Sequence, residues 1–146
     1  MLLAADVGNT QTLIGLFGDD GMPGPTGSDP ARSRCEEGLL DHWRIHTNGR
    51  RTSDEYALQI QEFLGFHGFS FDDDIDGIAI ASVVPSVTAA LRDMTVKYFG
   101  FKPVVIEAGV KTGMPILTEN PREVGADRIA NAVGAADIYG GPIVVI

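Results

Sequence analysis

The pattern of apolar and polar residues predicts three strands within the first 46 residues. Residues 2–7 are apolar apart from Asp6, which is typical of a buried strand, and residues 11–17 form a second apolar run. The few residues between these runs are a Gly-Asn-Thr turn, so we expect the two strands to pair as a hairpin. Residues 39–46 alternate between two faces and predict a third strand.

Helices and strands alternate along the rest of the chain. A helix is predicted over 53–65, where Thr52 and Glu55 have the spacing of a capping box. The face that this helix buries is expected to carry Tyr56, Ile60, Phe63 and Leu64. Residues 77–84 are predicted to form a buried strand, and Pro85 to start a second helix. That helix is expected to hold Val87, Ala90, Leu91, Met94 and Tyr98 on one stripe.

The last predicted elements are a strand over 103–108 and a helix that ends near Tyr139, before Gly140 and Gly141. The start of this helix has two interpretations. Asn120, Pro121 and Glu123 resemble a helix start, whereas Gly125 interrupts the segment and favours a start near Ala126.

The order of the elements predicts the fold class. Three antiparallel strands followed by alternating helices and strands indicate an α/β protein with a mixed sheet, a ribonuclease-H-like (actin-like ATPase) domain, because a doubly wound nucleotide fold alternates from its start. We expect residues 1–139 to form this domain. Within it, residues 18–38 are dense in Gly, Pro and like charges and predict a flexible loop. Residues 140–146 end in a new apolar run and are expected to begin a second actin-like domain that is otherwise absent.

Charge and composition narrow the classes of partner. The 146 residues include 11 Lys and Arg against 20 Asp and Glu, a formal net charge of −9, which argues against a nucleic-acid partner. No apolar stretch approaches the ~18 residues of a membrane span, and the start lacks the basic region of a secretory signal. We therefore expect a cytoplasmic protein with no membrane partner. The single cysteine, Cys35, is interpreted as having no function.

The first candidate site is the sequence DVGNT at 6–10. In a hairpin turn Gly8 lets the backbone approach an anion, and the N–H groups around Asn9 and Thr10 can hold phosphate oxygens. The Asp6 carboxylate would repel phosphate unless a magnesium ion bridged the two, often through water. The alternative is a plain Gly-Asn hairpin turn without a ligand.

The second candidate site is NPREVGADRIANA at 120–132. With a helix start near Ala126, Asp127 and Arg128 lie in the first helical turn, where the helix dipole stabilises a carboxylate and backbone donors are free. The alternative is that Asp127 and Arg128 form a local ion pair without a further role.

Other motifs fail on spacing. Asp72, Asp74 and Asp76 match the start of a calcium-binding loop, but the closing Glu would have to be at Val83, within a predicted strand. Residues 109–112 lack the first glycine of a P-loop. His42 and His46 share a strand face but have no third ligand at a suitable spacing, so we interpret them as surface residues.

Together the two candidate sites resemble those of the type III pantothenate kinases, within the superfamily of actin, sugar kinases and chaperone ATPases. The matching motifs are DVGNT at 6–10, TSDE at 52–55, SVVPSVT at 82–88 and NPREVGADRIANA at 120–132. The resemblance implies ATP-dependent phosphorylation of pantothenate to 4'-phosphopantothenate, the first step of coenzyme A biosynthesis. Two alternatives are a non-catalytic regulatory member similar to transcription accessory factors, and a sugar or acetate kinase of the same superfamily, which the GADR motif disfavours.

The resemblance also implies roles for individual residues. Asp127 would be the catalytic base, and Gly125, Ala126 and Arg128 would bind the substrate beside it. Asp6 would face the magnesium ion, through water. The residues that would bind the ATP phosphates are Asp6, Val7, Gly8, Asn9, Thr10, Gln11, Thr12 and Leu13.

The remaining implications concern cofactors, partners and completeness. The resemblance implies ATP, Mg²⁺ and a monovalent cation, K⁺ or NH₄⁺, whose ligands would lie beyond Ile146, and it implies a homodimer. Thr118 departs from the family pattern, in which many members have a substrate-contacting tyrosine nine residues before the catalytic aspartate. Because the second phosphate motif of the family is missing, we expect residues 1–146 alone to be inactive.

Overall fold

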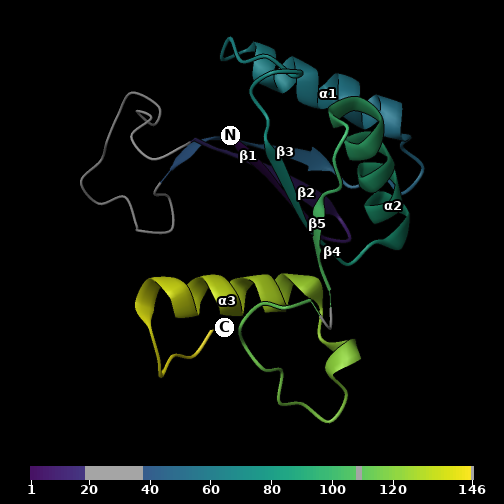
Figure 1. Ribbon diagram of the computed structural model, residues 1–146. Coiled ribbons are helices and arrows are strands. Elements are labelled where there is room, and N and C mark those ends of the chain that lie inside the picture. Colours follow the sequence, from purple (N-terminus) through teal and green to yellow (C-terminus); the bar gives the residue numbers. More distant parts are fainter. Residues whose placement is uncertain (19–37, 108–109, 146) are drawn as a thin grey trace.

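A computed structural model describes residues 1–18, 38–107 and 110–145 of the chain. Nearly all of the predicted loop at 18–38 lies outside the described residues, and so does Cys35. Figure 1 shows the described part as a central sheet with helices on both sides.

Within the described residues the sheet contains five strands in the order β3-β2-β1-β4-β5. Their bounds are Leu2–Val7 for β1, Gln11–Phe17 for β2, Leu39–His46 for β3, Gly77–Ser82 for β4 and Val104–Ile106 for β5. Strand β2 pairs antiparallel with both β1 and β3, whereas β4 pairs parallel with both β1 and β5. The predicted mixed sheet, with its N-terminal hairpin, is therefore confirmed.

The helices divide between the two faces of the sheet. Helices α1 (Ser53–Gly65) and α2 (Pro85–Met94) lie together on one face, and α3 (Ala126–Tyr139) lies on the opposite face (Figure 1). The capping box predicted for α1 is present, because Thr52 Oγ1 accepts from Glu55 N at 3.3 Å and Glu55 Oε2 accepts from Thr52 N at 2.7 Å. Each bond satisfies a backbone donor that the helix start would otherwise leave unpaired.

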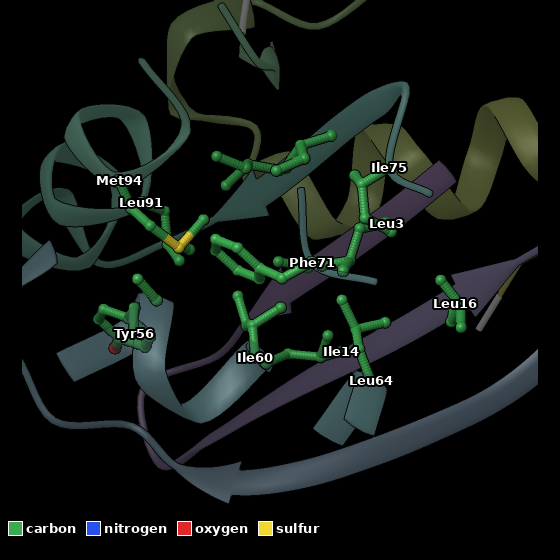
Figure 2. Packing of buried hydrophobic residues seen from close by; sticks show 14 of the residues in the cluster. Leu3, Ile14, Leu16, Tyr56, Ile60, Leu64, Phe71, Ile75, Leu91 and Met94 are labelled. Carbon is green, nitrogen blue, oxygen red and sulfur yellow. The ribbon is translucent and has the colours of Figure 1, made fainter. Parts of the chain in front are cut away.

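The main core fills the space between the sheet and helices α1 and α2. Figure 2 shows Leu3, Ile14 and Leu16 of the strands meeting side chains of both helices. From the helices come Tyr56, Ile60, Leu64, Leu91 and Met94. The predicted buried face of α1 is thus confirmed, with Phe63 partly buried at its edge. The Tyr56 hydroxyl is buried and has no hydrogen-bond partner among the described residues, and burial raises its pKa.

The second helix departs from its predicted length. The α-helical stretch ends at Met94, and a π-helical turn, η2 (Thr95–Phe99), follows. Within that turn Lys97 Nζ and Tyr98 Oη both donate to Asp54 Oδ1 of α1, at 2.7 and 2.9 Å. The prediction that Tyr98 continues the buried stripe is therefore wrong, because its hydroxyl reaches across to a partner on another helix.

Three other boundaries differ from prediction. Strand β4 ends at Ser82 rather than at residue 84, because Ser82 Oγ accepts from Val84 N and begins a turn. Strand β5 keeps only three residues of the predicted six. Residues 142–145 form no strand.

None of the helices found in the described ranges has the length and apolar content of a membrane span.

Candidate active site

The β1–β2 turn is tightly closed. Gly8 N donates to Gln11 O at 3.0 Å, and a Cβ atom added to Gly8 would lie 3.2 Å from that same oxygen. Two-residue hairpin turns that favour glycine require a positive φ, but neither Gly8 nor Asn9 has one. The turn is therefore not of the positive-φ types that favour Gly-Asn, and the glycine is needed here for close approach of the backbone.

Among the eight residues predicted to bind phosphate, two are buried and two others lie exposed at the tip of the turn. Val7 and Thr12 are fully buried on the core side of the sheet, so their side chains cannot contact a ligand. Asn9 and Thr10 are exposed, and their N–H groups make no backbone hydrogen bond within the described residues. The tip of the turn therefore presents free donors, which is the arrangement that an anion requires.

A cavity of about 390 Å³ lies between the sheet and α3, on the face opposite the main core. Its floor consists of small residues from three neighbouring strands: Ala4, Gly15, Ala79 and Ala81. Asp6 lines the same cavity, and Ala130 of α3 contributes to its opposite wall. The size is in the range of sites that hold small molecules, roughly 300 to 1,000 Å³.

The start of α3 combines both helix starts that the sequence left open. A 3₁₀ turn, η3 (Pro121–Glu123), comes first, and Gly125 then serves as the N-cap of α3. A Cβ atom at Gly125 would collide with Asp127 Oδ1 and would lie 3.7 Å from Val83 Cγ1. Glycine at this position therefore leaves room for the Asp127 carboxylate, whereas the contact with Val83 would be an ordinary one.

The Asp127 carboxylate is partly engaged. Its Oδ1 atom accepts from Arg128 N at 2.8 Å, whereas Oδ2 has no partner among the residues that the structure describes. Arg128 is exposed, and its guanidinium makes no ion pair with Asp127. The interpretation of these two residues as a local ion pair therefore does not fit, and both Asp127 Oδ2 and the guanidinium are available to a ligand.

The pKa of Asp6 depends on burial and on the charge of Asp127. The pKa of Asp6 is raised above its ordinary value of 3.8, first by burial against the apolar cavity wall and second by the negative charge of Asp127. Asp6 keeps an exposed edge, so we take only the direction of this shift. The contribution of Asp127 acts between residues that are 121 positions apart in sequence (127 − 6).

The donors present limit which metal could bind. Within the described ranges no group of three or more His, Cys, Asp or Glu side chains could hold a metal ion, so His42 and His46 form no zinc site. Both histidines are exposed, as predicted, and His42 lines the rim of the cavity. One or two carboxylates fit a Mg²⁺ ion, which commonly takes its remaining ligands from water and phosphate.

Sequence reasoning missed two features of this site. The small residues of the floor were not singled out, although Ala4, Ala79 and Ala81 recur at every second position of neighbouring strands, a pattern that indicates an open sheet face. Thr47 was also missed. It follows β3 directly and forms hydrogen bonds to the β1–β2 hairpin, from Thr47 Oγ1 to Gly8 O at 2.8 Å and from Thr47 N to Thr10 O at 2.9 Å.

The sheet order and the mixed pairing define an α/β domain of the ribonuclease-H-like, actin-like class, as predicted. Asp6 and Leu13, next to its hairpin turn, and Ala130 of α3 line the same cavity. The chain belongs to the type III pantothenate kinase family, whose family model matches residues 2–146. The family resemblance that the sequence indicated is thereby confirmed.

Curated relatives agree with this assignment. The chain is 50% identical over 150 residues to the type III pantothenate kinase of Streptomyces avermitilis and to that of Streptomyces coelicolor. It is 46% identical over 148 residues to the type III pantothenate kinase of Thermobifida fusca. In each case the match covers 100% of this chain and 50% of the relative, so the chain spans about half the length of these relatives.

One solved structure is similar at a lower level. The large terminase of the thermophilic bacteriophage D6E has a TM-score of 0.43 and 18% sequence identity to this chain. The match covers 92% of this chain and 25% of the terminase, and the similarity is too low to bear on function.

Proposed function

We propose that this chain is the N-terminal half of an ATP-dependent pantothenate kinase that produces 4'-phosphopantothenate. Family membership supports this proposal, and one observation of the structure carries it: Asp6, beside the exposed turn, lines a cavity of about 390 Å³ to which α3, the helix that carries Asp127 in its first turn, contributes Ala130. Phosphoryl transfer requires such an arrangement, in which phosphates and the attacking hydroxyl meet across a single cavity.

Each part of the cavity has a role under this proposal. The N–H groups of Asn9 and Thr10 bind phosphate oxygens of ATP. Asp127 Oδ2 accepts the proton of the pantothenate hydroxyl, while the bond from Arg128 N to Oδ1 fixes the orientation of the carboxylate. The exposed Arg128 guanidinium pairs with the pantothenate carboxylate, since the two groups can form parallel hydrogen bonds.

Mg²⁺ belongs to the same proposal. Asp6 would hold it, through water, and the ion would neutralise the negative charge of the phosphates. The monovalent cation, the homodimer and the cytoplasmic location remain predictions from the family resemblance.

The regulatory alternative receives no support from the comparisons, whose relatives are named as kinases. The chain also retains Asp6, Asp127 and Arg128. A member without catalytic activity would have no need for a carboxylate with a free oxygen at Asp127.

The test uses this chain joined to a C-terminal half of the kind its relatives have, referred to below as the full-length protein. We expect it to form phosphopantothenate from pantothenate and ATP, and we expect residues 1–146 alone to form none. Mass spectrometry of the product with labelled ATP is the measurement. Absence of product from a folded full-length protein that binds ATP would contradict the kinase proposal and favour the regulatory alternative.

A further inference from the structure

Thr47 is the side chain that connects β3 to the exposed turn. It lies directly after β3, is only 8% exposed, and contacts the hairpin through its backbone and its hydroxyl. Thr47 N donates to Thr10 O at 2.9 Å, and Thr47 Oγ1 donates to Gly8 O at 2.8 Å. These bonds tie both ends of the turn to a neighbouring strand.

A third hydrogen bond fixes the direction of the network. Thr47 Oγ1 and Thr12 Oγ1 are 2.9 Å apart, and either could donate on distance alone. A hydroxyl has a single proton, and that of Thr47 is already given to Gly8 O, so Thr12 must donate to Thr47. The result is a buried chain of hydrogen bonds from Thr12 through Thr47 to the carbonyl of Gly8.

The turn is also held from its other side. Val83 N, in the loop after β4, donates to Val7 O at 3.0 Å. That bond uses backbone atoms alone, so no side-chain substitution removes it. Substitution of Thr47 can therefore alter the position of the turn by removing one functional group, the hydroxyl.

We propose that Thr47 is a positioning residue that fixes the β1–β2 turn in the geometry in which the N–H groups of Asn9 and Thr10 bind phosphate. This inference rests on the proposed function of the turn. Thr47 itself is buried and touches no ligand. It acts by holding the Gly8 carbonyl toward β3, which leaves the opposite side of the turn, with its free donors, directed outward.

The test compares two threonine-to-valine substitutions in the full-length protein. Thr47→Val keeps the shape and removes the hydroxyl, and we expect KM for ATP to rise about tenfold, the factor that corresponds to a loss of about 1.4 kcal/mol. KM for pantothenate should stay unchanged. Thr95→Val is the matched control, because Thr95 is also buried and its hydroxyl donates to Leu91 O of α2 at 2.7 Å.

Thr95→Val should change neither KM, and Thr47→Ser, which restores the hydroxyl, should return KM for ATP to the parent value. A purely structural role of Thr47 would give equal effects on both substrates, or the same effect in both valine variants, and would overturn the proposal. If Thr47→Val does not fold, Thr47→Cys is the substitute, since a thiol is only a weak donor. An unchanged KM for ATP in that variant would also overturn it.

A separate variant distinguishes this inference from the proposed function. Gly8→Ala places a Cβ 3.2 Å from Gln11 O and distorts the turn directly. If Gly8→Ala raises KM for ATP and Thr47→Val does not, only the role of Thr47 fails. If neither variant changes KM for ATP, the turn does not bind phosphate, and the proposed function of the turn fails as well.

Discussion

The two faces of the sheet are formed by the same strands but have different roles. Toward α1 and α2, the strands present large side chains such as Leu3, Ile14 and Leu16, each at most 1% exposed. Toward α3, the intervening positions line the cavity, and several of them carry small residues, such as Ala4 and Gly15. Because successive side chains of a strand point to opposite faces, one sequence can encode both surfaces independently.

This difference shows where stability and chemistry are located. The face toward α1 and α2 excludes water and supplies most of the apolar burial that stabilises the fold. The face toward α3 gives up that burial and keeps space for a ligand beside Asp6. Substitutions on the two faces should therefore separate into effects on stability and effects on activity.

The largest expected effect is a loss of activity on the α3 side of the sheet, caused by Asp127→Asn in the full-length protein. The substitution removes the proton acceptor, so kcat should fall by roughly 10² to 10⁴-fold. The melting temperature should stay close to that of the parent, because Asp127 contributes nothing to the main core. Steady-state kinetics with a thermal melt measure both. A near-normal kcat would remove Asp127 from its role as base.

The next largest effect compares two leucines of β2 that point to opposite faces. Leu16 is fully buried in the main core, whereas Leu13 lines the cavity. Leu16→Ala should lower the free energy of unfolding by about 2 to 5 kcal/mol, the usual cost of a core cavity. Leu13→Ala should cost less than about 1.5 kcal/mol, because its side chain is only partly buried. Urea unfolding of residues 1–146 measures both. Equal losses would contradict the division between the two faces.

A smaller effect is expected at the start of α1. Thr52→Ala removes the N-cap and should cost about 1 kcal/mol, whereas Ser53→Ala next to it should stay within about 0.5 kcal/mol. The hydrogen bonds from Thr52 lower the pKa of Glu55. A lowered folded-state pKa gives stability that is present above the ordinary value of 4.5 and lost as pH falls through the lowered pKa.

The difference between the parent and Thr52→Ala should therefore shrink in acid. Urea unfolding at neutral pH and at a pH below the titration of Glu55 provides the comparison. A difference that is the same at both pH values would show that the hydrogen bond from the Thr52 hydroxyl to Glu55 does not contribute to stability, since the backbone bond from residue 52 to Glu55 remains in Thr52→Ala.

Much of the fold could be predicted because local signals agree with it. The bounds of β1, β2 and β3 follow from their apolar runs and alternation, and α1 begins where its capping box places it. The change from α-helix to π-helix at Thr95 could not be predicted, because Lys97 and Tyr98 find their partner, Asp54, more than 40 positions away. A helical pattern in sequence does not contain such a partner.

The candidate site was predicted in its residues but not in its geometry. Asp6 and Asp127 were identified from their motifs, yet only the parallel pairing of β1 with β4 and the packing of α3 bring them together. The role of Thr47 depends on where β3 ends relative to the turn, which no local pattern gives. The floor of the cavity needs three strands side by side before its small residues share a surface.

The account depends most on Asp6 and Asp127 sharing one cavity, and the pKa of Asp6 tests this directly. Carbon-13 NMR of the Asp6 carboxyl in residues 1–146 should give a pKa above its ordinary value of 3.8. Asp127→Asn should lower that pKa without abolishing the shift, because burial is the larger cause. Asp137→Asn, farther along α3, should leave it unchanged. If Asp127→Asn does not lower the pKa of Asp6, or lowers it no more than Asp137→Asn, the two carboxylates do not face each other and the proposed active site is wrong.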